Sequence, residues 1–440
     1  MNKFKINIDS GAKKIIEILK YNNFEAYVVG GCVRDSLLKR APGDWDLTTN
    51  ALPQEVMDIF KNLGYKVIPT GIKHGTVTIL IDKNSYEITT YRIDGEYENS
   101  RTPKDVEFTK SLKEDLKRRD FTINAMAYND LNGLIDYFNG VEDLNNRIIK
   151  SVGNAEKRFT EDALRMMRAV RFMAQLEFKI ESSTLNALRS LSKNIGVISV
   201  ERVREEFNKL ILSNVYYMNE LKYTGLLHYF LKIHMNNYEF IKELNYEDFI
   251  NKSSVSINYI KENYGEISLE LILTILLYNL ERQNLSEINI SEEILRIMRY
   301  DKKFILKVKL LIKFMKKEIL NDNKDIKYVL RDIGEENLRA VINLKKACLL
   351  NETEEYRRIK EYELNEILYK LESILELKEC YVIKDLKVKG KDLIELGISP
   401  GKNIGEILEY LLCKVIEDNK VNNKEKLIKI VEKNFIKVEY

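Results

Sequence analysis

The chain has 440 residues, more than one hydrophobic core usually serves, so we expect two to four domains. Its 71 basic and 68 acidic residues leave a formal net charge of +3, so an anionic partner must be held by a local basic patch rather than by an overall field. Four scattered cysteines without a CxxC pair, and only three histidines, argue against a disulfide framework, a structural zinc site and a histidine-based hydrolase.

The sequence contains neither a recognisable secretion signal nor a membrane-spanning segment. The first residues, "MNKFKINIDSGAKKII", contain no apolar segment followed by a small-residue cleavage site. The longest apolar run, residues 267–280, is interrupted by Glu270 and is too short for a membrane span. We therefore expect a cytoplasmic protein without a membrane contact, and no stretch indicates an obligate protein partner.

The first 140 residues mix predicted helices and strands. Residues 12–22 and 53–63 have helical patterns, and Pro53 fits a first helical position. The predicted strands are short and rich in β-branched or aromatic residues: 26–31, 45–49, 65–69, 75–81 and 86–92. Because "DKNS" between the last two is typical of a hairpin turn, we expect an α/β head with a mixed sheet and an antiparallel hairpin.

The stretch "VVGGCVRDSLLKRAPGDWDL", residues 28–47, combines a glycine pair with paired carboxylates. On a strand, Asp44 and Asp46 would project to one face while Trp45 faces the core. Two carboxylates this close need a cation, and oxygen ligands of this kind suit Mg²⁺ with substrate phosphates, as phosphoryl or nucleotidyl transfer requires. The alternative is an exposed acidic strand without a ligand.

Four further residues are candidates near that pair. Gly30 and Gly31 let the backbone approach a ligand, and Arg34 at the following helix start offers a fork to a triphosphate. Glu87, on the strand of residues 86–92, is a candidate third catalytic carboxylate, although glutamates on strand surfaces are common.

Residues 94–104 are polar and rich in turn formers, which predicts a mobile loop. After it, "DLKRRDFTINAMA" at 115–127 is expected to start a helix that carries a basic cluster. Arg119 and Asp120 are candidates for the triphosphate and the ribose hydroxyls, and Asn124 is assigned to the same nucleotide site.

The stretch "RFTEDALRMMRAVRFMAQL", residues 158–176, predicts an amphipathic helix capped at Thr160. Asp162 and Arg165 are three residues apart, so a continuous helix would place their side chains side by side. An acceptor beside donors matches the amino group and ring nitrogen of cytosine and adenine, and it would reject uracil and guanine. The alternative is an ordinary surface ion pair. Further arginines predict a phosphate-lined cleft here: Arg158, Arg168 and Arg171.

From about residue 156 onward the pattern is helical, with proline absent until Pro400. We divide the chain into a head at 1–150, a neck with the nucleotide-selecting helix at 151–215, a body at 216–330 and a tail at 331–440. Near the end, "GISPGKNIGEIL" places Lys402 before a helix start, where a phosphate contact and a plain loop are equally compatible with the sequence.

Several of these stretches, in this order, resemble the class II tRNA nucleotidyltransferases, the CCA-adding enzymes among the polymerase-beta-like nucleotidyltransferases and poly(A) polymerases. The resemblance rests on "GGCVRD" with "DWDL", "RRDFTINAMAYN", "LIDYFNGVEDLNNRIIKSVGNAEKRFTEDALRMMRAVRF" and "ISVERVREEFNKLI", and more weakly on "VKGKDLIELGISPGKNIGEIL". It implies a head, neck, body and tail. It also implies that Asp44 and Asp46 hold metal and that Glu161, Asp162 and Arg165 select the base.

The resemblance further implies that the tRNA 3′ hydroxyl attacks the α-phosphate of CTP twice and then of ATP. The acceptor stem would lie on a basic inner face and the elbow near Lys402. Enzymes that add only A and bacterial poly(A) polymerases share the head motifs and remain alternatives. The complete segment 92–118 argues against an enzyme that adds only CC, because the resemblance implies that such enzymes lack part of it.

Two other classes of function are also compatible with parts of the sequence. A non-catalytic RNA-binding protein would be expected to lack Asp44 or Asp46, and both are present. A nucleotidyltransferase for a small-molecule hydroxyl needs only the glycine turn and the carboxylates, but the helical bulk and the arginines of residues 158–171 favour a large polyanion.

Overall fold

The computed structural model describes residues 4–95, 97–98, 102–103, 106–235, 244–283 and 290–436. These residues form two compact units, the first comprising 1–243 with 297–299 and the second 244–296 with 300–440. Within the described residues, no helix is both long and apolar enough to cross a membrane.

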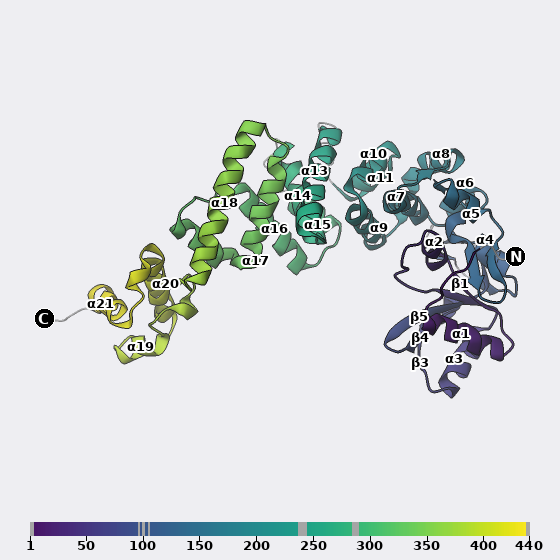
Figure 1. Ribbon diagram of the computed structural model, residues 1–440, viewed down its shortest axis with the longest axis horizontal. Coiled ribbons are helices and arrows are strands. Elements are labelled where there is room, and N and C mark those ends of the chain that lie inside the picture. Colours follow the sequence, from purple (N-terminus) through teal and green to yellow (C-terminus); the bar gives the residue numbers. More distant parts are fainter. Residues whose placement is uncertain are drawn as a thin grey trace. The chain divides into compact units, whose positions relative to one another are not determined.

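The first unit contains a seven-stranded mixed sheet (Figure 1) with the strand order β11-β10-β1-β2-β5-β4-β3. Its strands are β1 Ala26–Val29, β2 Leu47–Thr49, β3 Lys66–Gly71, β4 Thr76–Ile81, β5 Asn84–Thr90, β10 Met126–Asn129 and β11 Gly133–Asp136. β2 and β5 pair in parallel, and the other neighbours pair antiparallel. The structure thereby confirms the mixed sheet.

The predicted hairpin is also confirmed. β4 and β5 pair from Thr76 opposite Thr89 to Ile81 opposite Asn84. The two turn residues, Asp82 and Lys83, adopt left-handed φ angles of 49° and 70°, as a tight two-residue hairpin requires. At the sheet edge, β3 carries a proline and an irregular register, both of which discourage pairing with another chain.

Short helices and strands surround the sheet. They are α1 Ser10–Tyr21, α2 Gly31–Leu37, α3 Pro53–Asn62, η1 Ile72–His74, β6 Arg92–Asp94, β7 Tyr97–Glu98, β8 Thr102–Pro103, β9 Val106–Phe108, α4 Leu112–Lys117, η2 Thr122–Asn124 and α5 Gly140–Asn145. α1 and α3 match the predicted helices, and Pro53 occupies the first turn of α3. Much of the predicted loop of 94–104 lies outside the described residues.

Two local expectations for the head were wrong. The helix expected over 115–127 ends at Lys117, and the chain continues through η2 into β10. β2 begins only at Leu47, so Asp44 and Asp46 lie in extended chain before the strand, and Trp45 is half-buried rather than in the core.

The rest of the first unit is almost entirely helical. Its elements are β12 Ile148–Ile149, α6 Ala155–Glu161, α7 Leu164–Leu176, β13 Lys179–Ile180, α8 Ser182–Leu191, η3 Ser192–Val197, α9 Val200–Ser213, η4 Val215–Tyr217, α10 Met218–Tyr223 and α11 Leu226–His234. α7 packs against α9 and buries Met166 and Val170, as its apolar spacing predicted.

The second unit is helical throughout its described residues. Its elements are α13 Tyr246–Tyr264, α14 Leu269–Gln283, α15 Ile290–Ile297, α16 Lys302–Lys316, α17 Asn323–Leu349, α18 Glu354–Glu376, η5 Ile383–Asp385, α19 Gly390–Glu395, α20 Lys402–Glu417, η6 Asn419–Val421 and α21 Lys424–Phe435. A non-helical residue, Gly334, interrupts α17.

Candidate active site

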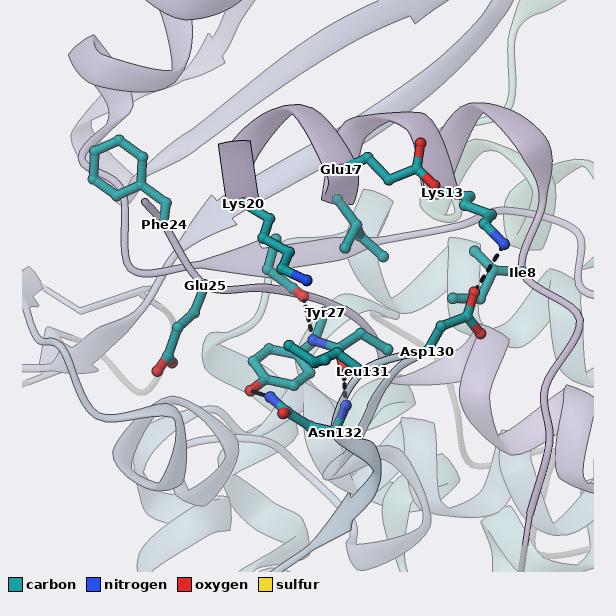
Figure 2. A pocket seen from close by; sticks show the side chains of 13 residues that line it. Ile8, Lys13, Glu17, Lys20, Phe24, Glu25, Tyr27, Asp130, Leu131 and Asn132 are labelled. Carbon is teal, nitrogen blue, oxygen red and sulfur yellow. Dashed lines mark hydrogen bonds and ion pairs between the residues drawn. The ribbon is translucent and has the colours of Figure 1, made fainter. Parts of the chain in front are cut away.

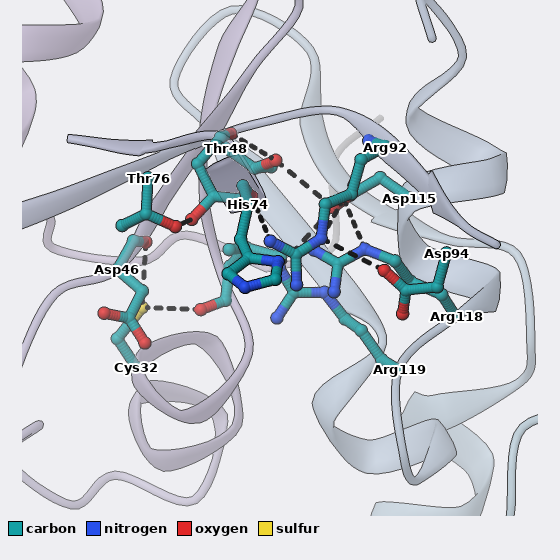
Figure 3. Close-up of polar contacts among 12 residues, drawn as sticks. Cys32, Asp46, Thr48, His74, Thr76, Arg92, Asp94, Asp115, Arg118 and Arg119 are labelled. Carbon is teal, nitrogen blue, oxygen red and sulfur yellow. Dashed lines mark hydrogen bonds and ion pairs between the residues drawn. The ribbon is translucent and has the colours of Figure 1, made fainter. Parts of the chain in front are cut away.

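Asp44 and Asp46 lie in the segment that leads into β2, which begins at Leu47. The backbone N–H of Val29 in β1 donates to the carbonyl of Asp46 at 3.0 Å, which fixes this segment beside the glycine turn. Both side chains are exposed, and among the described residues none donates a hydrogen bond to either carboxylate. The polar groups around Asp46 are drawn in Figure 3.

The protein around Asp46 disfavours its charged form. Although the residue is open to solvent, the surrounding atoms displace water from the carboxylate and, together with the nearby charge of Asp44, raise its pKa to about 6. Arg119 opposes this shift, and Glu87 in β5 adds to it. Two carboxylates without donors, one of them destabilised as an anion, fit a hard divalent cation.

The cation site would not be formed by side chains alone. Across the described parts of the chain, no three Asp, Glu, His or Cys side chains gather into a metal-binding group. Glu87 therefore influences Asp46 through charge without forming a third ligand in this structure.

The glycine turn brings a cation close to this pair. Gly30 has a φ of 81°, a conformation that favours glycine, and a Cβ placed there would lie 3.2 Å from Nη1 of Arg119. The Nε of Arg119 is buried and has no hydrogen-bond partner among the residues that the structure describes. Arg119 thus keeps donor capacity next to the turn.

A buried carboxylate that the sequence analysis missed, Asp115, organises the basic cluster. It is fully buried at the end of α4 and accepts hydrogen bonds from Arg118 at 2.8 Å and from Thr48 of β2 at 3.2 Å. Arg119 lies 3.5 Å from this carboxylate, and the backbone N–H of Arg92 donates to it at 3.4 Å. Figure 3 shows these residues together. Burial alone would raise the pKa of Asp115, but the two arginines lower it.

The other predicted nucleotide-binding residues of the head form one buried network. Arg34 donates to both carboxylate oxygens of Asp35, at 2.8 and 2.9 Å, and to Asn124 at 2.7 Å. Asn124 donates to Asp120 at 3.2 Å, and Arg168 from α7 donates to the other Asp120 oxygen at 2.8 Å. Burial raises the pKa of Asp120, but Arg168 outweighs it and lowers the pKa to about 2.

The predicted arrangement of the base-selecting helix was wrong. The helix breaks at Asp162, which adopts an extended conformation (φ −136°, ψ 102°) between α6 and α7, and Thr160 lies inside α6 instead of capping it. Asp162 therefore does not share a helix face with Arg165. Its carboxylate accepts from the first N–H of α7, on Leu164, at 3.1 Å and from Arg202 of α9 at 3.0 Å.

Arg165 has different partners. Its Nη1 donates to Glu161 at 3.1 Å and to the carbonyl of Arg158 at 3.2 Å, and its Nη2 donates to the carbonyl of Arg118 at 3.0 Å. Because Arg118 also holds Asp115, Arg165 is tied to the basic cluster of the head.

Glu206, one turn after Arg202 on α9, was also missed. It is buried and accepts from Arg171 at 2.7 Å and from Arg168 at 3.4 Å. The stretch "ISVERVREEFNKLI" contributed only to the family resemblance. Its opposite charges at 202 and 206, one turn apart on one helix face, could have indicated a helix that pairs with charged residues of another helix. Arg171 is thus buried in the protein, and Arg158 pairs with Glu161 at 3.0 Å.

Two further features are not part of this cluster: the predicted Lys402 and a cavity beside α1. Lys402 opens α20 in the second unit, almost fully exposed and 3.4 Å from Glu406. A cavity of about 410 Å³ beside α1, shown in Figure 2, contains the Lys13–Asp130 ion pair and a hydrogen bond from Asn132 to the hydroxyl of Tyr27. None of the predicted site residues lines that cavity.

A mixed sheet with paired carboxylates beside a glycine turn, joined to a helical segment rich in buried arginines, defines the class of template-independent nucleotidyltransferases. Residues 26–150 match the family "Poly A polymerase head domain" and residues 177–237 the family "Probable RNA and SrmB- binding site of polymerase A". Residues 268–431 match "tRNA nucleotidyltransferase domain 2 putative".

Relatives define the family more closely. The CCA-adding enzyme of Ligilactobacillus salivarius is 35% identical over 97% of this chain and 98% of its own length, and that of Enterococcus faecalis is 34% identical over 96% and 95%. A local match to the Lactobacillus delbrueckii subsp. bulgaricus CCA-adding enzyme is 54% identical, and it spans 46% of this chain and half of that relative's length.

Solved structures agree. The Bacillus stearothermophilus CCA-adding enzyme in complex with CTP has a TM-score of 0.76 at 31% identity, covering 96% of both chains. The Thermotoga maritima CCA-adding enzyme complexed with tRNA has a TM-score of 0.61 at 21% identity over 97% and 96%, which supports the fold. The chain belongs to the CCA-adding enzyme family, and the family resemblance of its sequence is confirmed.

Proposed function

We propose that the chain is a cytoplasmic, Mg²⁺-dependent tRNA nucleotidyltransferase that adds C, C and A to the tRNA 3′ end from CTP and ATP. The observation that carries the proposal is the exposed Asp44 and Asp46 pair, whose side chains accept no hydrogen bond from a described residue and whose backbone is bonded to Val29, next to the Gly30 turn and Arg119. The family's relatives and the nucleotide and tRNA complexes of its solved members support the choice of substrates.

Asp44 and Asp46 would hold the metal, which when bound activates the 3′ hydroxyl and neutralises charge on the phosphates. Arg119 lies next to the Gly30 turn, with its Nη1 3.2 Å from a Cβ built there, and its buried Nε has no hydrogen-bond partner among the described residues. This spare donor capacity supports Arg119 as the residue that would bind a triphosphate. Asp115 holds Arg118 and Arg119 against β2, so these cations stay in a fixed position relative to the metal-binding carboxylates.

Base selection is assigned to Asp162 and Arg165, with Glu161 supporting Arg165. Asp162 accepts and Arg165 donates, which matches the amino group and ring nitrogen of cytosine and adenine. In this structure both groups are held by protein partners, Arg202 and Glu161, so a bound base replaces or shares these hydrogen bonds. Arg34, Asp120 and Asn124, which are buried, and Arg168 form the hydrogen-bonded network that would support the nucleotide.

The test is incorporation of labelled CTP and ATP with Mg²⁺ on three RNAs: tRNA ending before CCA, tRNA ending after CC, and an unrelated RNA. We expect two C residues and then one A on the first, and one A on the second. Reaction of only the second RNA would show an A-adding enzyme. Long A tails on all three would show a poly(A) polymerase.

A further inference from the structure

A cavity of about 410 Å³ in the second unit is lined by a lysine that lacks a charged partner. Residues from α14, α16, α17 and α18 line this cavity. The amine of Lys345 on α17 donates to the backbone carbonyls of Met315 and Lys317, at 2.8 Å each. These carbonyls lie at the C-terminal end of α16, where helix carbonyls lack partners within the helix. Among the described residues, no carboxylate forms an ion pair with Lys345.

The other charged side chains that line the cavity are already paired. They form these ion pairs: Arg282 with Glu352 at 3.0 Å, Lys316 with Glu281 at 2.5 Å, and Lys360 with Glu363 at 2.7 Å and with Glu318 at 3.5 Å. The cationic and anionic side chains of the lining balance one another when Lys345 is left out. The cavity therefore supplies no counter-ion that would keep the amine of Lys345 protonated.

The amine of Lys345 has the hydrogen bonds of a neutral nucleophile. Burial, with the nearby charge of Lys360, lowers the pKa of Lys345 to about 8. A neutral amine has two N–H donors and one lone pair, so the two carbonyls satisfy its donors and leave the lone pair available. Cys348, three residues further along α17, does not compete, because burial raises the pKa of its thiol to about 11 and keeps it protonated.

We propose that Lys345 is an acylation site, whose amine accepts a small acyl group from an acyl phosphate or an acyl thioester. The amine nitrogen attacks the carbonyl carbon and forms a C–N bond, while the C–O bond to phosphate or the C–S bond to the thiol breaks. The leaving group takes that electron pair, and one amine proton passes to solvent. The cavity has room for a short acyl chain beside Met315 and Leu364 of its lining. This inference does not depend on the proposed function.

Acylation would change the hydrogen bonds at the end of α16. An acylated Nζ carries one N–H instead of two, so the carbonyl of Met315 or of Lys317 loses its partner. The last turn of α16 is then held less firmly against α17. We expect several-fold faster amide hydrogen exchange over residues 313–317 in the acylated chain than in the unmodified chain.

The test uses the full wild-type chain, treated with acetyl phosphate in one arm and with acetyl-coenzyme A in the other. Mass spectrometry of the digested chain follows acetylation at each lysine over time. The comparison lysines are exposed Lys303 on α16 and buried Lys327, which is paired with Glu379. At pH 7.5 we expect Lys345 to react about tenfold faster than Lys303, and Lys327 to react more slowly than both. The arm that shows this difference identifies the acyl donor.

The pH profile separates a neutral amine from one that is merely accessible. The rate at Lys345 should level off above about pH 8, whereas an ordinary lysine, with a pKa of about 10.4, continues to gain rate up to pH 10. Lys345→Arg should lose one acetylation site and keep the melting temperature, because the guanidinium still donates to both carbonyls. If Lys345 reacts no faster than Lys303 in either arm, or its rate rises in parallel to pH 10, the proposal is overturned. Its amine is then a protonated cap of α16.

Discussion

The two sets of carboxylates in the first unit have opposite electrostatic states. Before β2, Asp46 accepts no side-chain hydrogen bond from a described residue and its pKa rises to about 6, whereas buried Asp120, held by Arg168, has a pKa lowered to about 2. The first set has no cation paired with it in the described part of the protein, so a bound metal would have to neutralise its charge. The second has its cation built in, so it contributes to the shape of the pocket rather than to the chemical step.

The largest effect on activity is expected when a carboxylate of the first set is removed. Asp46→Asn should lower nucleotide incorporation by about 10⁴-fold, or ~5 kcal/mol of transition-state stabilisation, because a metal contact is lost. The melting temperature should not fall, since the exposed carboxylate accepts no hydrogen bond from a described residue. Steady-state incorporation and thermal melts check both parts. Asp58→Asn, an exposed position on α3, is the control, and an active Asp46→Asn enzyme contradicts the metal assignment.

The complementary change is in the buried set. Glu206→Ala leaves Arg168 and Arg171 without one of their buried partners, and breaking such a pair costs about 3 to 5 kcal/mol. Urea unfolding of the variant should show this loss, while the exposed neighbour Glu205→Ala should unfold like the wild type. A loss below about 1 kcal/mol would mean that water or Asp120 compensates the arginines.

Sequence patterns correctly predicted the structural features that depend on residues close together in the chain. The mixed sheet, the Asp82–Lys83 hairpin turn and the helical character after residue 156 were confirmed, because each follows from local periodicity and turn chemistry. The metal-binding, nucleotide-binding and tRNA-contacting roles of the named residues stay predictions.

What the sequence could not show was pairing between distant residues. Asp162 and Arg202 are forty positions apart, and Thr48 and Asp115 sixty-seven apart, so no spacing rule connects them. The break at Asp162 was also hidden, because the residues around it have ordinary helix-forming patterns and tertiary pairing with α9 overrides them. A helix-surface pair was therefore expected where the structure has two separate ion pairs.

The lowered pKa of Asp120 predicts how the stability of the protein depends on pH. The folded pKa of Asp120 is about 2 against an ordinary value of 3.8, so its contribution is complete above about pH 4 and is lost as the pH falls towards 2. The shift corresponds to about 2 kcal/mol. Urea unfolding at pH 5 and pH 3 should show a smaller acid loss in Asp120→Asn than in the wild type. If both lose the same stability, other carboxylates dominate acid unfolding.

The smallest expected effect is at Asp162, which forms an ion pair with Arg202. Arg202 holds this carboxylate from α9 but is itself about one-third exposed, so Arg202→Met should cost little stability. Without Arg202, Asp162 keeps the hydrogen bond from the N–H of Leu164 but is less firmly oriented. It then accepts from a base less selectively, and we expect the ratio of CTP to UTP incorporation to fall about tenfold, ~1.4 kcal/mol. Arg202→Lys should restore part of the ratio, because it keeps the charge but donates from one nitrogen. The exposed Lys209→Met on the same helix is the control. An unchanged ratio in Arg202→Met would show that Leu164 alone orients Asp162 through its backbone N–H.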